Sequence, residues 1–127
     1  MPDGTDTVRR FFGAWSAGDL DTMLAAVDEG VVVLPVLEPL FEQPSYHGRD
    51  GVAAAFHEIA ARWDRFEPRV EDTGQAGDQV IAFVHLVLEA RGRSSDARLA
   101  VVSNVRDGLI TSLESHDAGS IREHLGS

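Results

Sequence analysis

The chain of 127 residues has no cysteine and no long apolar run. Without cysteine, disulfides, thiolate nucleophiles and cysteine-based zinc sites are excluded. No stretch of about 20 apolar residues could cross a bilayer, and Met1 to Asp6 has neither the basic nor the apolar region of a secretory signal. We therefore expect a cytoplasmic protein with no membrane partner, whose chemistry would use His, Asp, Glu, Tyr, Ser, Thr or Asn.

Basic residues are also few, with 11 Lys and Arg against 21 Asp and Glu, giving a formal net charge of -10. They are scattered along the chain, so they form no stripe that could neutralise a phosphate backbone. Nucleic acid is therefore not an expected partner. The hydrophobic share of 43% is ordinary for a globular protein. A chain of this length fits one domain, and we predict a single domain over residues 1–127.

Apolar residues at helical spacing predict three helices in the first half of the chain. The first helix carries one apolar stripe, formed by Val8, Phe11, Phe12 and Trp15. Gly18 ends this helix, and Asp19 can cap a shorter second one that Gly30 stops. Asp50 can cap the third and longest helix, which we expect to end near Phe66.

The remainder is predicted to be mostly β-strand, because β-branched and aromatic residues alternate with turn residues. The expected strands cover 31–36, 69–73, 80–90, 97–106 and 109–116, with a loop at 37–48 and turns at 76–79 and 92–96. Asp107-Gly108 between two strands is a strong hairpin signal, because a type I′ turn needs positive φ at both central residues.

A two-residue turn at Asp107-Gly108 sets Arg106 opposite Leu109 and sorts the side chains of the last two strands by face. One face would carry Ala100, Val102, Asn104, Thr111, Leu113, Ser115 and Asp117. The other would carry Leu99, Val101, Ser103, Val105, Ile110, Ser112, Glu114 and His116. Both faces mix aliphatic and polar groups, whereas a half-solvated sheet alternates more cleanly. We infer that one face covers a pocket and the other is partly covered by a second subunit, as in a homodimer.

Several phrases carry a resemblance that covers nearly the whole chain. They are 17–21 (AGDLD), 46–52 (YHGRDGV), 76–80 (AGDQV), 105–110 (VRDGLI), and Asp117 followed by Leu125-Gly126. With the order of elements, they resemble the nuclear transport factor two superfamily and its SnoaL-like branch. This resemblance implies an α+β fold: a cone-shaped, curved, antiparallel or mixed sheet packed over three N-terminal helices and enclosing one apolar pocket. The superfamily includes enzymes and plain binding modules, so the fold does not give the function.

The ketosteroid isomerases of that superfamily use a tyrosine and two aspartates, which the resemblance places at three positions of this chain. These positions are about Phe11, Leu34 or Pro35, and Val102 or Val101. None of these side chains can move a proton or donate a hydrogen bond, so the proton shuttle and the oxyanion hole are both missing. We exclude the ketosteroid isomerase mechanism.

Limonene epoxide hydrolases of the same superfamily activate water with an Asp-Arg-Asp set from neighbouring strands. The resemblance places their aspartate of the last strand near Ser115, so this set is incomplete too. The same placement implies that Val102, Leu113, Ser115 and Asp117 point into the cone. The face that carries Asn104 would then be the pocket face.

Asp117 and His85 are the candidate catalytic residues. By the resemblance, Asp117 could act as a general acid or base at the cavity, or it could simply cap a terminal helix. His85 lies in an apolar strand, where it is either a neutral proton acceptor or a satisfied core residue. If both face inward, they would form one site. We expect no cofactor. We also expect no metal site, because Glu114 and His116 have no third ligand at convincing spacing.

Candidate ligand-binding residues are Asn104, Trp15, Tyr46, Phe56, Trp63, Leu113 and Ser115. Asn104 could fix a carbonyl or hydroxyl group, or pair with Thr111 across the hairpin. Aromatic walls suit a flat apolar ligand, such as a polyketide, a terpenoid or an aromatic compound. Two hypotheses remain: a cofactor-free acid-base enzyme (cyclase, isomerase, dehydratase or hydrolase) that acts on such a molecule, and a non-catalytic binding or dimerisation module of the same fold.

Overall fold

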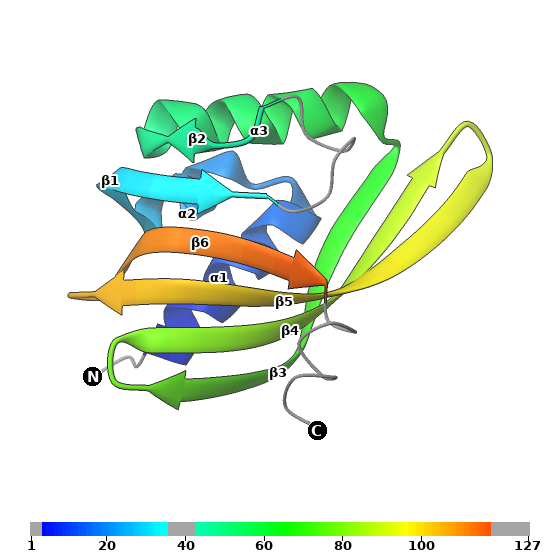
Figure 1. Cartoon of the computed structure of the whole chain (residues 1–127). Coiled ribbons are helices and arrows are strands. Elements are labelled where there is room, and N and C mark those ends of the chain that lie inside the picture. The colour runs from blue at the N-terminus through cyan, green and yellow to red at the C-terminus, as the bar shows by residue number, and fades with distance from the viewer. Residues whose placement is uncertain (1–3, 36–42, 118–127) are drawn as a thin grey trace.

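The computed structural model describes residues 4–35 and 43–117, which form three helices and one mixed sheet (Figure 1). The helices are α1 (Gly4–Ala17), α2 (Leu20–Ala25) and α3 (Gly48–Arg62). The strands are β1 (Val27–Leu34), β2 (Tyr46–His47), β3 (Arg65–Ala76), β4 (Gln79–Ala90), β5 (Arg93–Arg106) and β6 (Leu109–Asp117). The sheet order is β2-β1-β6-β5-β4-β3, with β1 and β6 parallel and the other neighbours antiparallel.

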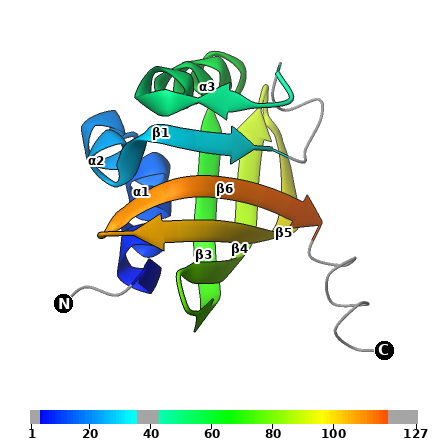
Figure 2. The same ribbon diagram turned by 60° about the vertical axis from the view of Figure 1, so that its left-hand side comes forward.

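The helices cover one face of the sheet, which is strongly curved and does not close into a barrel (Figure 2). The predicted α+β cone is therefore confirmed. The stripe of α1 is buried against β3 and β4, since Val8 and Phe11 are 0% and 1% exposed. None of the described helices is both long and apolar enough to cross a membrane.

The end of α1 follows the prediction. Gly18 has φ +73°, and its N–H donates to the Trp15 carbonyl at 3.0 Å, which is the left-handed ending that glycine favours. Asp19 then caps α2 by accepting from the hydroxyl and the backbone N–H of Thr22, and these hydrogen bonds lower the pKa of Asp19. The predicted stop at Gly30 is wrong. The helix ends at Ala25, and Gly30 lies within β1 because that segment pairs with β6.

The C-terminal end of α3 also differs from the prediction. The helix ends at Arg62, where the N–H of Trp63 still donates to the Ile59 carbonyl at 2.9 Å. From Arg65 onward the chain pairs with β4, with Phe66 opposite Leu88. Backbone pairing with a neighbouring strand thus overrides an apolar spacing that would fit a longer helix.

Strand β5 begins earlier than predicted because the hairpin that joins it to β4 turns over only Arg91 and Gly92. Both residues have positive φ, at 53° and 76°. The predicted turn over 92–96 is therefore wrong, and residues 93–96 extend β5. The turn at Asp107 and Gly108 has φ values of 55° and 77°, which confirms the predicted type I′ hairpin.

Candidate functional site

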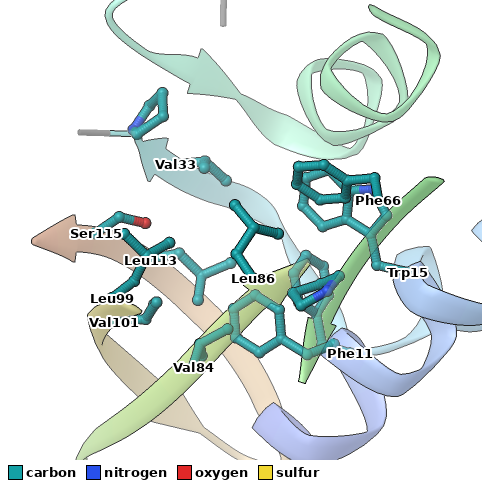
Figure 3. Close-up of a pocket in the computed structure, with 13 residues that line it drawn as sticks. Phe11, Trp15, Val33, Phe66, Val84, Leu86, Leu99, Val101, Leu113 and Ser115 are labelled. Atoms are coloured by element: carbon teal, nitrogen blue, oxygen red, sulfur yellow. The ribbon is translucent and has the colours of Figure 1, made fainter. Parts of the chain in front are cut away.

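An apolar cavity of about 50 Å³ lies between the inner face of the sheet and α1 (Figure 3). It is lined by Phe11, Phe12, Trp15, Val33, Pro35, Phe66, Pro68, Val84, Leu86, Leu99, Val101, Leu113 and Ser115. Figure 3 shows Val33, Leu113 and Ser115 on one side, with Trp15 and Phe66 on the other. The cavity is thus bounded by α1 and by five strands of the sheet.

Aromatic side chains form the wall of the cavity on the helix side. Phe11 packs edge-on against Phe12 at 5.2 Å and against Trp15 at 5.9 Å between ring centroids. Trp15 also contacts Phe66 of β3, with centroids 5.1 Å apart. Edge-to-face and tilted pairs at these distances are favourable beyond the area they bury. Phe11, Phe12, Trp15 and Phe66 therefore pack as one aromatic cluster on this side of the cavity.

The lining is almost free of polar groups. Among the lining side chains, only the Ser115 hydroxyl and the Trp15 indole carry a polar atom, and none is ionisable. Phe11, Pro35 and Val101 line the cavity, and they are among the positions that the resemblance assigned to the tyrosine and aspartates of ketosteroid isomerases. Within the described lining there is accordingly no group that can exchange a proton near neutral pH.

A β-bulge at Thr111 changes which residues face the cavity. Val105 pairs with Ile110 as predicted, but Asn104 pairs with Ser112 rather than with Thr111. The extra residue moves the rest of β6 by one position relative to β5. Leu113 and Ser115 of β6 therefore share the inner face with Leu99 and Val101 of β5.

The predicted pocket face is consequently wrong for β5. Val101 lines the cavity, whereas Val102 lies on the outer face, opposite Glu114. Asn104 is also on the outer face, where it is exposed and donates from Nδ2 to the Ser112 hydroxyl at 2.7 Å. Its side chain does not reach the cavity, and the expected partner Thr111 instead donates to the Asn104 carbonyl at 3.2 Å.

His85 lies on the outer face of the sheet. Its neighbours Val84 and Leu86 both line the cavity, and side chains alternate along a strand. The His85 Nε2 atom is 2.7 Å from Asp96 Oδ2, with the histidine side chain 22% exposed. The condition that His85 and Asp117 both face inward is therefore not met.

Asp117 closes β6 opposite Leu99, but its side chain lies outside the part of the chain that the structure describes. On the outer face, His116 Nε2 is 3.4 Å from Glu114 Oε1. No group of three or more potential metal ligands occurs among residues 4–35 and 43–117.

Tyr46 and Arg49 hold β1, β2 and α3 together. Tyr46 is buried in β2, with its hydroxyl hydrogen-bonded to Glu58 of α3 and to the Gln43 N–H. It does not line the cavity, although it was a predicted ligand-binding residue. Arg49 donates from Nε and Nη2 to the Val27 carbonyl at 3.3 and 3.2 Å. The side chains of Tyr46 and Arg49 therefore make contacts within the fold.

Phe56 and Trp63 lie at a second feature, an open groove of about 380 Å³ between α1, α3 and the start of β3. Its residues are Trp15, Ser16, Ala17, Gly18, Phe56, Ile59, Ala60, Trp63, Asp64, Arg65, Phe66 and Glu67. Trp15 and Phe66 line both the groove and the cavity. The candidate ligand residues are therefore divided: Trp15, Leu113 and Ser115 lie at the cavity, and Phe56 and Trp63 at the groove.

Five residues that line the cavity were not among the predicted site residues: Phe66, Val84, Leu86, Leu99 and Val101. Phe66 was assigned to a helix, and the faces of β5 were inverted by the unrecognised bulge. For β4, the buried positions alternate strictly from Val80 to Leu88, but the sequence is apolar at nearly every position, so periodicity could not identify the inner face.

A family model described as the SnoaL-like domain matches residues 8–113. The chain belongs to the SnoaL-like family. No curated protein matches this SnoaL-like chain, but many solved structures do. It is similar to an NTF2-like protein of unknown function from Burkholderia pseudomallei, with 22% identity, a TM-score of 0.81 and 98% of each chain covered.

Two further solved structures extend this comparison. TerC, co-crystallised with polyporic acid, has 16% identity, a TM-score of 0.80 and 98% coverage of each chain. IdmH from Streptomyces antibioticus, described as a polyketide cyclase, has 21% identity and a TM-score of 0.78, with 99% of this chain and 100% of that one covered. At these identities the likeness establishes the shared fold.

Proposed function

We propose that this SnoaL-like protein binds a hydrophobic small molecule, of polyketide, terpenoid or aromatic type, in the cavity of the cone. The observation that carries this proposal is the lining: aromatic and aliphatic side chains from α1 and five strands converge on one space, with the Ser115 hydroxyl at its edge. A largely apolar cavity with a few placed polar groups is the usual form of a small-molecule site. The polyporic acid of TerC and the cyclase description of IdmH agree with this class of ligand.

The size of the cavity sets a condition on binding. Its volume of about 50 Å³ is well below that of the engineered cavity of about 150 Å³ that admits benzene. A ring-sized ligand must therefore displace a side chain of the wall. Phe66 and Val33 are partly exposed, so they can move at less cost than the fully buried Phe11.

Binding without acid-base catalysis fits the described lining best, since that lining contains no ionisable side chain. One observation favours an enzyme as the second candidate: Asp117 pairs with Leu99, which lines the cavity. Asp117→Asn separates the two. Loss of turnover of a compound retained by the protein, with unchanged binding, would support the enzyme, and unchanged turnover would exclude Asp117 as its acid or base.

The binding proposal is tested by mass spectrometry of small molecules retained by the purified protein and by toluene titration followed through methyl resonances in NMR spectra. We expect the methyl signals of Leu86, Leu99 and Leu113 to shift. Val33→Phe should abolish these shifts by filling the cavity. Val32→Phe, at a partly exposed position that does not line the cavity, is the matched control. If no compound is retained and toluene shifts none of these signals, the proposal fails.

We also propose a homodimer through the outer face of the sheet. Ile81, Phe83, Val87 and Val102 lie there as partly exposed apolar side chains on two adjacent strands. Grouped, partly exposed apolar side chains can mark an interaction surface. The His85–Asp96 hydrogen bond and the Arg98–Glu71 ion pair lie on the same face, between Phe83 and Val87 along β4, and would add polar contacts to the interface.

A further inference from the structure

The groove between α1, α3 and β3 has the size and lining of a ligand site in its own right. Its volume of about 380 Å³ lies within the range of about 300–1,000 Å³ that small-molecule sites occupy. Phe56, Trp63, Trp15 and Phe66 supply aromatic surface. Because Trp15 and Phe66 also line the cavity, they form the wall between the two spaces. The groove therefore lies on the opposite side of that wall from the cavity.

Trp63, which lines the groove, carries an unused hydrogen-bond donor. Its Nε1 atom is sealed from solvent and has no hydrogen-bond partner among the described residues. Leaving a buried donor unsatisfied costs free energy, whereas most buried polar groups in proteins are paired. Because Nε1 is closed to solvent, the indole ring must first tilt toward the groove. A ligand acceptor in the groove can then accept a hydrogen bond from the N–H, which relieves this cost.

The charges around the groove select against an anionic acceptor. Arg65 is the one cationic side chain in the lining, and its guanidinium is paired with Glu67 and faces Glu89 at 4.0 Å. Arg65, and then Arg69, hold the pKa of Glu67 below its usual range, so Glu67 is ionised near neutral pH. With Asp64, the lining therefore carries more negative than positive charge. A carboxylate or phosphate is disfavoured, and a neutral oxygen acceptor is not.

We propose that this groove binds a neutral, planar aromatic carbonyl compound, with its rings between Phe56 and the Trp15–Phe66 pair and its oxygen accepting from Trp63 Nε1. This site is separate from the cavity of the proposed function, although the two share a wall. The aromatic rings supply affinity through buried area. The indole N–H supplies the preference for a carbonyl.

The test compares 9-fluorenone with fluorene, which has the same ring skeleton without the carbonyl. Affinities are measured by equilibrium dialysis, and the indole N–H signals of Trp15 and Trp63 are followed in nitrogen-15 NMR spectra. One hydrogen bond of ordinary net strength predicts that fluorenone binds on the order of 5-fold more tightly. Fluorenone should also move the Trp63 indole signal downfield, toward a hydrogen-bonded position, and fluorene should not.

Variants assign the site. Trp63→Phe should remove the preference for fluorenone while fluorene still binds. Ala60→Leu, in the groove lining, should weaken both compounds, whereas Ala61→Leu, exposed on the same helix and outside the lining, should not. Val33→Phe closes the cavity and should leave fluorenone binding intact, so failure of one site is distinguishable from failure of the other.

Three results would overturn the proposal. One is equal affinity for the two compounds. Another is fluorenone binding that Ala60→Leu leaves unchanged. The third is a Trp63 indole signal already at a hydrogen-bonded position before any ligand is added, because the donor would then not be free to select one. The Ala60→Leu arm keeps the test decisive if Trp63→Phe does not fold.

Discussion

The bulge at Thr111 predicts that a carboxyl introduced at Val101 will enter the apolar cavity. Val101 is 2% exposed and lines the cavity, so Val101→Asp loses about 2 kcal/mol of apolar burial. The new carboxyl must also either stay ionised in an apolar space or hold a proton. Holding it at pH 7, about 3 pH units above an ordinary aspartate pKa of about 3.9, costs about 4 kcal/mol. A total of about 6 kcal/mol rivals the stability of a whole domain.

The sign of the pH dependence follows from the direction of the pKa shift. Burial raises the pKa of the introduced carboxyl above its unfolded value, so the folded state binds more protons than the unfolded state. The penalty is therefore small near pH 4 and grows as the pH rises toward the folded pKa. Urea unfolding of the variant and the wild type at pH 4 and pH 7 should show a difference about 4 kcal/mol larger at pH 7.

Asn104→Asp is the matched control for this experiment. Asn104 would point into the cone if β5 and β6 paired without a bulge, but it is exposed on the outer face in the structure. Its replacement should show little pH-dependent penalty relative to the wild type. A pH-dependent penalty for Asn104→Asp, together with none for Val101→Asp, would refute the assignment of faces.

Three further predictions concern the turn, the acidic groove and the dimer. Gly108→Ala should destabilise the protein by about 1 kcal/mol in urea unfolding because φ is +77° there, whereas Gly74→Ala, with open space around it, should not. Glu67→Gln should reduce the loss of Tm between pH 6 and pH 3, because a lowered carboxyl pKa gives stability that disappears as pH falls below the ordinary value; an unchanged Tm difference would contradict this. If the proposed dimer forms, Ile81→Glu should convert it into a 13.8 kDa species in sedimentation, and a wild type that sediments only as that species would exclude the dimer.

Local sequence signals were sufficient for α1, the start of α2 and the final hairpin. The stripe of α1, the glycine after it and the Asp107-Gly108 turn each depend on residues close together in the chain, so the prediction and the structure agree. The errors arose where distant segments decide. The end of α3 is fixed by the pairing of Phe66 with Leu88. No residue next to Arg62 is a glycine or proline that would signal the end of a helix.

The cavity was harder to predict than the fold because its lining depends on one extra residue. The sequence from Leu109 to Leu113 carries adjacent apolar residues at both Leu109 and Ile110, so its alternation fits a register with or without a bulge. Because Thr111 is an extra residue in β6, Val101 rather than Val102 lines the cavity, and Asn104 lies on the outer face. Trp15 of α1, whose position depends on no strand register, lies at the cavity.

The two hydrogen bonds from Arg49 to the Val27 carbonyl affect how related sequences should be compared. The Arg49 guanidinium holds the carbonyl of Val27, where the pairing of β1 with β6 is irregular. A Cβ added at Gly51 would lie only 3.0 Å from the carbonyl carbon of Tyr46, so glycine allows the close approach of α3 to β2 there. The phrase at 46–52 is one of those that carry the family resemblance, yet its side chains join α3 to β1 and β2. A related sequence that matches this phrase therefore shares a structural contact of the fold. Inferring a shared activity requires a match among the residues that line the cavity or the groove.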